Sequence, residues 1–391
     1  MTKRFKTTAR TLETVKKYDY IIAGAGCAGY SLLYHLLQDP ILCKKKILVV
    51  DANFDKCNDR TWCFWEATQG PFESIVCNKW SSIEVRKETM TRVLPTSPFE
   101  YKMIQGIDFY QFVTAFAKQF DTIDWQLASI KSIESIDLHE ARVAWEDGSA
   151  IASYVFSSVK IQAQIQPSLW QHFKGIVVEF DEPVLDDSVA RLMDFNVPQM
   201  DATAFMYLLP MSNKKALIEY TLFSPAIILE SEYDQVIDAY LSKYYQGLNY
   251  KVLHTEMGAI PMTTKKFSTK NANIVSIGTM GDAVKASTGY AFQFIQEQAR
   301  RIVRQLNQHQ KLDPSVHHTR HQFYDAVLLY ILENKKMSGD EIFARIFKKN
   351  KAATIFKFLS NTSNLMEDIQ IMRTLPTLIF LPAAIKVLFR R

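Results

Sequence analysis

Hydrophobic and polar positions near the N-terminus predict a strand, a helix and a second strand in direct succession. Residues 18–23 form a mostly apolar run of strand length, residues 30–38 carry leucines at helical spacing, and residues 46–50 form a second apolar run. Glycines stand at positions 24, 26 and 29, between the first strand and the helix. This order and spacing are typical of the βαβ unit that binds a dinucleotide.

The glycine-rich turn has the features that a pyrophosphate requires. Gly24 permits a tight turn, Gly26 lets the backbone approach the phosphates, and Gly29 lets the helix pack closely on the strand, with Ala25 between the first two. The N-terminus of the helix offers free N–H groups to the phosphates. Asp51 ends the second strand, where an acid accepts hydrogen bonds from a ribose hydroxyl. The acid and the N-terminal position favour FAD over NADP, and we predict that these five residues contact FAD.

The pattern along the rest of the chain predicts an α/β fold with interleaved parts. The nucleotide-binding segments alternate with strand-rich segments, and the chain becomes helical towards its C-terminus. We expect a disordered lead-in (1–17), a discontinuous Rossmann-type FAD-binding domain like that of hydroxylase flavoproteins (18–75, 105–160 and 270–310), an antiparallel β-sheet substrate domain (76–104 and 161–269) and a helical, apolar and basic region for membrane access (311–391).

A second glycine-rich turn follows the buried run at 273–278. It resembles the second flavin motif of the hydroxylase and prenyl-reductase flavoproteins, in which an Asp contacts the ribityl chain. Counting from the strand places Thr279, after Gly278, at that position, whereas aligning on the Gly-Asp-Ala triplet places Asp282 there. Both registers stay open. Gly289 closes the motif, and we predict that all four residues lie near the flavin.

Charge is distributed unevenly along the chain. The net charge is +5, and residues 311–391 hold 13 Lys and Arg against 7 Asp and Glu, whereas the remainder holds 33 against 34. This local excess argues against a nucleic-acid binder and suggests contact with an anionic membrane surface. The apolar segment 374–389 is shorter than the roughly 20 residues of a spanning helix and contains two prolines. We expect it to lie on a membrane or to line an apolar tunnel, with an ordinary core helix as the alternative.

Other observations concern compartment and metal binding. The five cysteines all lie within the first 77 residues and lack a metal-binding spacing, which indicates a reduced protein on the cytoplasmic side. His317, His318 and His321, with Asp325 one turn further on, are interpreted as a solvated helix start, and no metal is predicted.

Glu219 is the candidate general acid. It lies in an apolar strand beside Leu217, Ile218 and Leu222, and burial there would raise its pKa and keep it protonated near neutrality. The alternative is an outward-facing strand residue. Asp194 is a second candidate, either in a proton relay or in a structural hydrogen bond.

The motifs together resemble those of the bacterial lycopene cyclases, flavoproteins, over nearly the whole chain. One departure concerns the acids: the family often has two before the Thr, and here Tyr220 takes the second position, which leaves Glu219 as the one acid carried over. The segments that carry the resemblance are Gly24–Gly29, Asn58–Trp65, Leu192–Phe195, Tyr207–Pro210, Ile218–Thr221, Gly258–Met262 and Ser287–Tyr290.

The resemblance implies a redox-neutral isomerase, an intramolecular lyase that cyclises the ψ-end groups of lycopene through gamma-carotene to beta-carotene. It implies Glu219 as the proton donor, reduced FAD as the group that stabilises the carbocation, and NAD(P)H as the reductant. Trp62, Phe64, Trp65 and Tyr207 are candidates for cation–π stabilisation. The expected partners are the two carotenoid substrates and a membrane surface contacted peripherally, with no nucleic acid and no obligate protein partner.

Two alternatives remain open at this point. A flavin-dependent isoprenoid reductase or hydroxylase would share the glycine motif and would consume NAD(P)H with each product. A non-catalytic carotenoid-binding protein at the membrane would need no buried acid and would tolerate Glu219→Gln.

Overall fold

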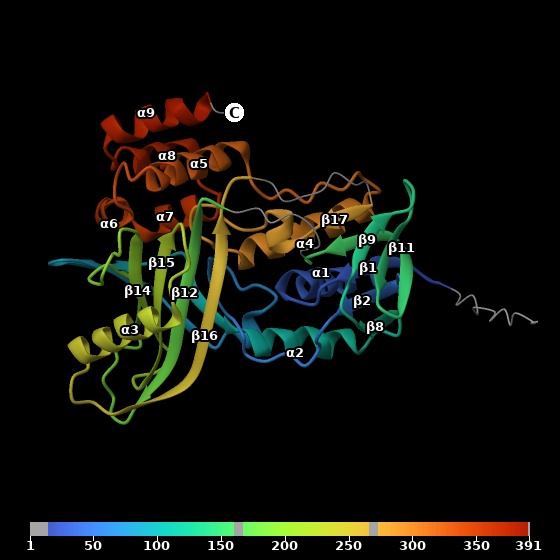
Figure 1. The fold of residues 1–391 in the computed structure, drawn as a ribbon, viewed down its shortest axis with the longest axis horizontal. Coiled ribbons are helices and arrows are strands. Elements are labelled where there is room, and N and C mark those ends of the chain that lie inside the picture. The colour runs from blue at the N-terminus through green and yellow to red at the C-terminus, as the bar shows by residue number, and fades with distance from the viewer. Residues whose placement is uncertain (1–14, 160–166, 266–272, 390–391) are drawn as a thin grey trace, which may run out of the picture.

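A computed structural model describes residues 15–159, 167–265 and 273–389 of the chain. Most of the predicted lead-in, residues 1–14, lies outside the described residues. The first strand begins at Lys16, so residues 16 and 17 belong to the sheet and not to a lead-in. Two seven-stranded sheets stand apart, with helices between them and a group of C-terminal helices above the sheet that contains strands β12, β14 and β15 (Figure 1).

The predicted βαβ unit is present, and its sheet has seven strands in the order β8-β2-β1-β11-β10-β9, with β17 paired to β11. Strand β1 is parallel to β2 and β11, and β11 is parallel to β17. Helices α1, α2 and α4 pack on one face of β1 and β2. On the other face, side chains of β1 and β2 share a second apolar cluster with side chains of β10 and β11. The elements are β1 (Lys16–Ala23), α1 (Cys27–Gln38), β2 (Ile47–Asp51), α2 (Gly106–Ala117), β8 (Ile123–Leu127), β9 (Ser132–Ser135), β10 (Ala141–Trp145), β11 (Gly148–Ser157), β17 (Ile274–Ser276) and α4 (Phe292–Asn307).

The second seven-stranded sheet has the order β16-β12-β15-β14-β13-β5-β6 and is antiparallel except where β13 pairs with β5. Helix α3 covers one face of it. The predicted sheet segment 161–269 supplies β12 to β16 of this sheet. The elements are β5 (Ser82–Lys87), β6 (Met90–Pro95), β12 (Leu169–Phe180), β13 (Val189–Asp194), β14 (Thr203–Pro210), β15 (Lys215–Ser224), α3 (Glu230–Tyr244) and β16 (Tyr250–Met262).

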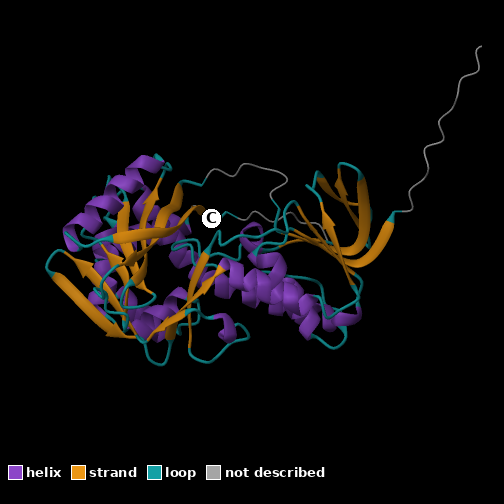
Figure 2. Ribbon diagram, turned by 90° about the horizontal axis from the view of Figure 1, so that it is seen from below, coloured by secondary structure: helices purple, strands orange, loops and turns teal. Residues whose placement is uncertain are grey.

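A small third sheet has the order β3-β7-β4. Its strands are β3 (Thr61–Glu66), β4 (Asn78–Trp80) and β7 (Glu100–Gln105), so the predicted sheet segment 76–104 is divided between two sheets. Figure 2 shows the long helices lying between the strand-rich ends of the molecule.

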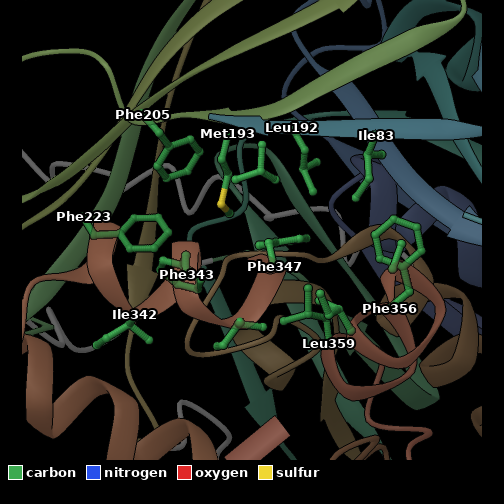
Figure 3. Close-up of a cluster of buried hydrophobic side chains, with 14 of the residues drawn as sticks. Ile83, Leu192, Met193, Phe205, Phe223, Ile342, Phe343, Phe347, Phe356 and Leu359 are labelled. Atoms are coloured by element: carbon green, nitrogen blue, oxygen red, sulfur yellow. The ribbon is translucent and has the colours of Figure 1, made fainter. Parts of the chain in front are cut away.

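The C-terminal region is helical, as the pattern predicts. Helix α6 packs on the large sheet, where Phe343 meets Phe223 and Phe347 faces the residues of β13 (Figure 3). The helices are α5 (Thr319–Glu333), α6 (Gly339–Lys349), α7 (Ala352–Leu359), α8 (Leu365–Met372) and α9 (Thr377–Leu388). Within the described residues, no helix has both the length and the apolar character needed to cross a membrane.

Candidate active site

The turn between β1 and α1 has the geometry expected of a phosphate cradle. Gly24 has a left-handed φ of 101°. A Cβ on Gly29 would collide with the carbonyl oxygen of Gly24, so helix and strand approach as closely as predicted. At Gly26, the N-cap of α1, no described atom lies within 4 Å of a hypothetical Cβ. Open space therefore lies over the free N–H groups of the helix, where a pyrophosphate fits.

Asp51 lies beside this turn at the end of β2, as predicted. The Ala25 N–H donates to one of its carboxylate oxygens. The other oxygen accepts from the Asn53 N–H and pairs with Lys56 at 3.1 Å. Asp51 thus ties the turn to the second strand, and its contact with a ribose stays a prediction.

The second glycine turn lies against the first. A Cβ on Gly278, which has a φ of 63°, would collide with the Cβ of Ala28 in α1 at 2.6 Å. Thr279 and Gly289 line a cavity of about 420 Å³ together with Gly26. Asp282 lines a smaller cavity, which Thr279 also lines. Of the two residues, Thr279 is the one that shares the 420 Å³ cavity with Gly26, and the contact of either residue with the flavin stays a prediction.

The 420 Å³ cavity also contains the candidate acid. Glu219 lines it from β15, and Tyr207 and Trp62 line it from β14 and β3. Phe64 and Trp65 line a neighbouring cavity of about 430 Å³, so they do not face Glu219 as directly. Glycine turn, carboxylic acid and aromatic rings thus meet in one space, although they are far apart in the sequence.

A second carboxyl group, Glu256 of β16, lines the same cavity and was not predicted. Strands β15 and β16 flank β12, and Glu219 and Glu256 are both in register with Gly175. Tyr207 is in register with Glu219 on its other side. Residues in register across a sheet point to the same face. The side chains of Glu219 and Glu256 therefore lie on one face of the sheet, on either side of Gly175, which has no side chain. A second carboxyl group, contributed by a strand distant in the sequence, therefore shares the cavity with Glu219.

Both carboxyl groups are buried, and each accepts a hydrogen bond from a threonine. Thr221 Oγ1 donates to Glu219 at 2.8 Å, and Thr61 Oγ1 donates to Glu256 at 2.8 Å. Burial, and then the charge of Glu256, raise the pKa of Glu219 to about 8, against the opposing effect of the Thr221 hydroxyl. Burial also raises the pKa of Glu256. Glu219 is therefore protonated near neutrality, as a general acid requires.

Asp194 is not brought together with Glu219. It is fully buried at the end of β13 and accepts a hydrogen bond from Tyr240 of α3 at 3.0 Å. Tyr240 in turn accepts from Arg191, which pairs with Glu84. This network lies on the α3 side of the sheet, away from the cavity, and it supports the structural role of Asp194.

An apolar cavity of about 310 Å³ adjoins the first. Thr288 and Tyr290 line both spaces, so the two cavities lie side by side. The apolar cavity is enclosed by helices α5 to α9, and α9 contributes Phe380, Leu381 and Ala384. The predicted apolar tail thus lines an internal space. It also exposes apolar side chains, with Leu378 at 92% and Phe389 at 84% exposure.

The three C-terminal histidines lie at the start of α5, as interpreted, and His318 is its exposed N-cap, but the interpretation as solvated residues is wrong for His321. His321 is fully buried, lies 3.2 Å from the Ser363 hydroxyl and packs near Asp368. Burial lowers the pKa of His321 to about 4 and keeps it neutral. The helices that cover it are distant in sequence. Among the described residues, no group of three or more His, Cys, Asp or Glu side chains could hold a metal ion.

Glu256 and its partner Thr61 are the main residues that sequence reasoning missed. Glu256 precedes Gly258 by two positions and therefore shares its face of the strand. A signal for it was present in the alternation of Glu256, Gly258 and Ile260, all of which line the cavity. The alternation identifies a cavity-lining face only once β16 is known to pair with β12.

The fold is that of the FAD-binding flavoprotein hydroxylases and halogenases. A variant of HpxO from Klebsiella pneumoniae, solved in complex with FAD, is similar with a TM-score of 0.59 and 14% identity, over 88% of this chain and 98% of that one. A geranylgeranyl bacteriochlorophyll reductase-like protein from Thermoplasma acidophilum has a TM-score of 0.57 and 11% identity, over 96% of each chain. The predicted fold class is confirmed.

The sequence identifies the family more narrowly. Residues 19–384 match the model of the lycopene cyclase protein family, so the chain belongs to that family. A lycopene beta-cyclase from Pantoea ananas is 28% identical over 260 residues, which make up 63% of this chain and 63% of that protein. The chain therefore matches somewhat less than two thirds of the length of this relative.

Proposed function

We propose that the protein is a lycopene beta-cyclase, an isomerase that converts the ψ-end groups of lycopene to β-ionone rings by way of gamma-carotene. The observation that carries the proposal is Glu219, a buried acid with a raised pKa in the cavity that also holds the glycine turns. Family membership and the Pantoea ananas relative support the same substrate class. The adjoining apolar cavity suits a polyene, because most of its lining residues are aliphatic or aromatic.

The proposed cofactor is FAD, with its pyrophosphate over Gly26 at the N-terminus of α1 and with Thr279 and Gly289 towards its ribityl and ring portions. When bound, reduced FAD supplies negative charge that stabilises a carbocation in a dry cavity. NAD(P)H is the proposed reductant that keeps the flavin active, without net redox change in the substrate.

Glu219 carries out the first proton transfer in this scheme. Its carboxylic acid donates a proton to the terminal double bond of the end group, and ring closure follows. The aromatic rings of Tyr207, Trp62 and Phe173 line the same cavity and are placed to stabilise positive charge through their π faces. The acid is buried, which limits the access of water that would otherwise capture the cation.

We further propose peripheral binding to the cytoplasmic side of a membrane through α8 and α9. Lycopene is apolar and long, so it enters from a bilayer more readily than from water. Helix α9 offers exposed apolar side chains outside and cavity-lining residues inside, and the C-terminal region has a basic excess that favours anionic lipids. The exposed residues are Leu365, Met366, Ile369, Met372, Leu378, Leu381, Ile385, Leu388 and Phe389.

Expression in cells that accumulate lycopene tests the proposal. We expect beta-carotene to form, with a change from red to orange-yellow. In purified protein supplied with lycopene and NAD(P)H, the product should exceed the NAD(P)H consumed. Stoichiometric consumption would instead support a reductase or hydroxylase. Binding of lycopene without conversion, under reducing conditions, would support a carotenoid-binding protein.

A further inference from the structure

Redox-neutral cyclisation needs a proton acceptor as well as a donor. After the ring closes, a ring C–H bond must break so that its electron pair forms the new double bond. The acceptor must lie in the same dry cavity as the donor, because water there would trap the cation. This requirement rests on the proposed function. Two further carboxyl groups line the cavity and are not used by the proposed first step: Glu256, which is buried, and Asp59, which is exposed.

We propose that Glu256 accepts the ring proton, and that Glu219 and Glu256 together hold one proton at the start and at the end of each turnover, while the substrate cation carries it in between. Both residues are in register with Gly175 from opposite sides of β12. Two strand spacings separate their Cα atoms by about 10 Å. Side chains that reach into the cavity from these positions can address two sides of one end group.

Gly175 keeps the space between the two acids open. A Cβ at this position would lie 3.3 Å from Cβ and 3.4 Å from Cγ of Glu219, and 3.1 Å from Cδ1 of Leu217. Such contacts are tighter than ordinary packing and would push the Glu219 side chain from its position. The glycine therefore has a role that its unremarkable φ does not reveal.

Each acid has its own hydrogen-bond donor, which suits two different tasks. Thr221 holds Glu219, and Thr61, at the start of β3, holds Glu256. Arg60 lies close enough to favour the charged form of Glu256, while Asp59 opposes it. Glu219 has only the threonine hydroxyl to favour its charged form. The asymmetry places the shared proton on Glu219 and the negative charge on Glu256 before reaction.

Besides Asp59 and Arg60, the cavity near the pair is lined by tyrosines and a cysteine that stay neutral near neutral pH. Burial raises the pKa of Tyr207, Tyr290 and Cys63, each of which senses the charge of Glu219. Two carboxylates in one buried space repel each other, so a pair of this kind holds one proton over a wide pH range. The Asp59 carboxyl group also lines the cavity, but it is exposed to solvent and accepts a hydrogen bond from the Tyr110 hydroxyl at 3.1 Å, whereas Glu256 is buried beside Glu219.

The proton balance closes within the pair. The O–H bond of Glu219 breaks and a C–H bond forms at the terminal double bond. The neighbouring double bond supplies the electrons for the ring C–C bond. A ring C–H bond then breaks, its electrons form the ring double bond, and the proton goes to Glu256. Transfer from Glu256 back to Glu219 restores the starting state, with no oxidant or reductant consumed.

Cyclisation in D₂O by the purified FAD-loaded protein tests this division of roles. Glu256→Gln should lower the rate of beta-carotene formation about 10²–10⁴-fold. Glu219 would still protonate the end group and take a proton back, so unreacted lycopene should gain deuterium. Glu219→Gln should give neither product nor deuterium exchange. Glu179→Gln, at an exposed position of β12, is the matched control and should behave as wild type.

Several outcomes would overturn the proposal. One is beta-carotene formation by Glu256→Gln at the wild-type rate, and another is recovery of the wild-type rate by this variant when the pH is lowered. A third is loss of both beta-carotene formation and deuterium exchange in Glu256→Gln while FAD remains bound. If Glu256→Gln does not retain FAD, Glu256→Asp is tested instead, by the rate of beta-carotene formation and by deuterium exchange into lycopene. Aspartate keeps the carboxyl group, but its shorter side chain holds that group further from the cavity. Failure of the proposed function itself would differ, because the wild type would then form no product.

Discussion

The ammonium group of Lys285 lies 2.7 Å from the carboxylate of Asp325, in an ion pair buried between the second glycine turn and helix α5. Lys285 also donates to Asn361, just after α7, at 2.9 Å, and Ser287 donates to Asp325 at 2.7 Å. Because Tyr290 follows in the same turn, these contacts fix the boundary between the acid-containing cavity and the apolar cavity.

We predict that Lys285→Met destabilises the protein by about 3–5 kcal/mol, because it leaves the carboxylate of Asp325 buried without its partner. Denaturant unfolding of the FAD-loaded protein measures the change. Lys335→Met is the control, since Lys335 pairs with Asp201 at an exposed position and such pairs contribute little. Equal effects of the two substitutions would contradict this role of the buried pair.

Gly26→Ala and Gly29→Ala should affect the protein in different ways. At Gly26 the new methyl group enters open space over the N-terminus of α1, so the fold should persist while FAD affinity falls. At Gly29 it collides with backbone, so the βαβ unit itself should be disrupted. Flavin absorbance and thermal unfolding of both variants check this. Normal FAD affinity in Gly26→Ala would argue against a pyrophosphate at this turn.

Activity should depend on pH through Glu219. The donor form of a carboxylic acid exists below its pKa, so turnover should be highest below about pH 8 and fall as the pH rises through that value. Thr221 donates to Glu219 and favours its charged form. Thr221→Val should therefore raise the pKa and move the alkaline limb of the rate profile to higher pH. A limb that stays in place, with bound FAD unchanged, would show that another group sets it.

Membrane association should depend on the exposed face of α9. The double variant Leu378→Glu and Leu388→Glu places charges at two exposed apolar positions and should weaken binding to anionic vesicles without loss of FAD. Leu138→Glu alters an equally exposed leucine in the segment between β9 and β10 and should bind as wild type. Vesicle sedimentation measures both, and equal binding by all three proteins would place the membrane contact elsewhere.

Local pattern was sufficient to predict the βαβ unit, and it made Glu219 a candidate buried acid with an outward-facing residue as the alternative. The glycine spacing and the apolar neighbours of Glu219 act within a few residues, so they are legible in the sequence. The sequence could not decide between Thr279 and Asp282, because the choice depends on which residue of the turn faces the space over α1.

Long-range pairing explains what the sequence did not reveal. Glu256 meets Glu219 only because β16 and β15 both pair with β12. Asp194 was a plausible relay until its strand was seen to direct it towards α3. His321 resembled a surface residue, since the segment around Ser363 that covers it lies beyond two further helices.

The most direct test of the central claim is a single-turnover measurement on Glu219→Gln with reduced FAD bound and lycopene supplied in vesicles. The substitution keeps the size of the side chain and removes the acid. We predict that beta-carotene formation is lost while flavin content and lycopene binding remain those of the wild type. Cyclisation at the wild-type rate would contradict the role of Glu219 as the proton donor.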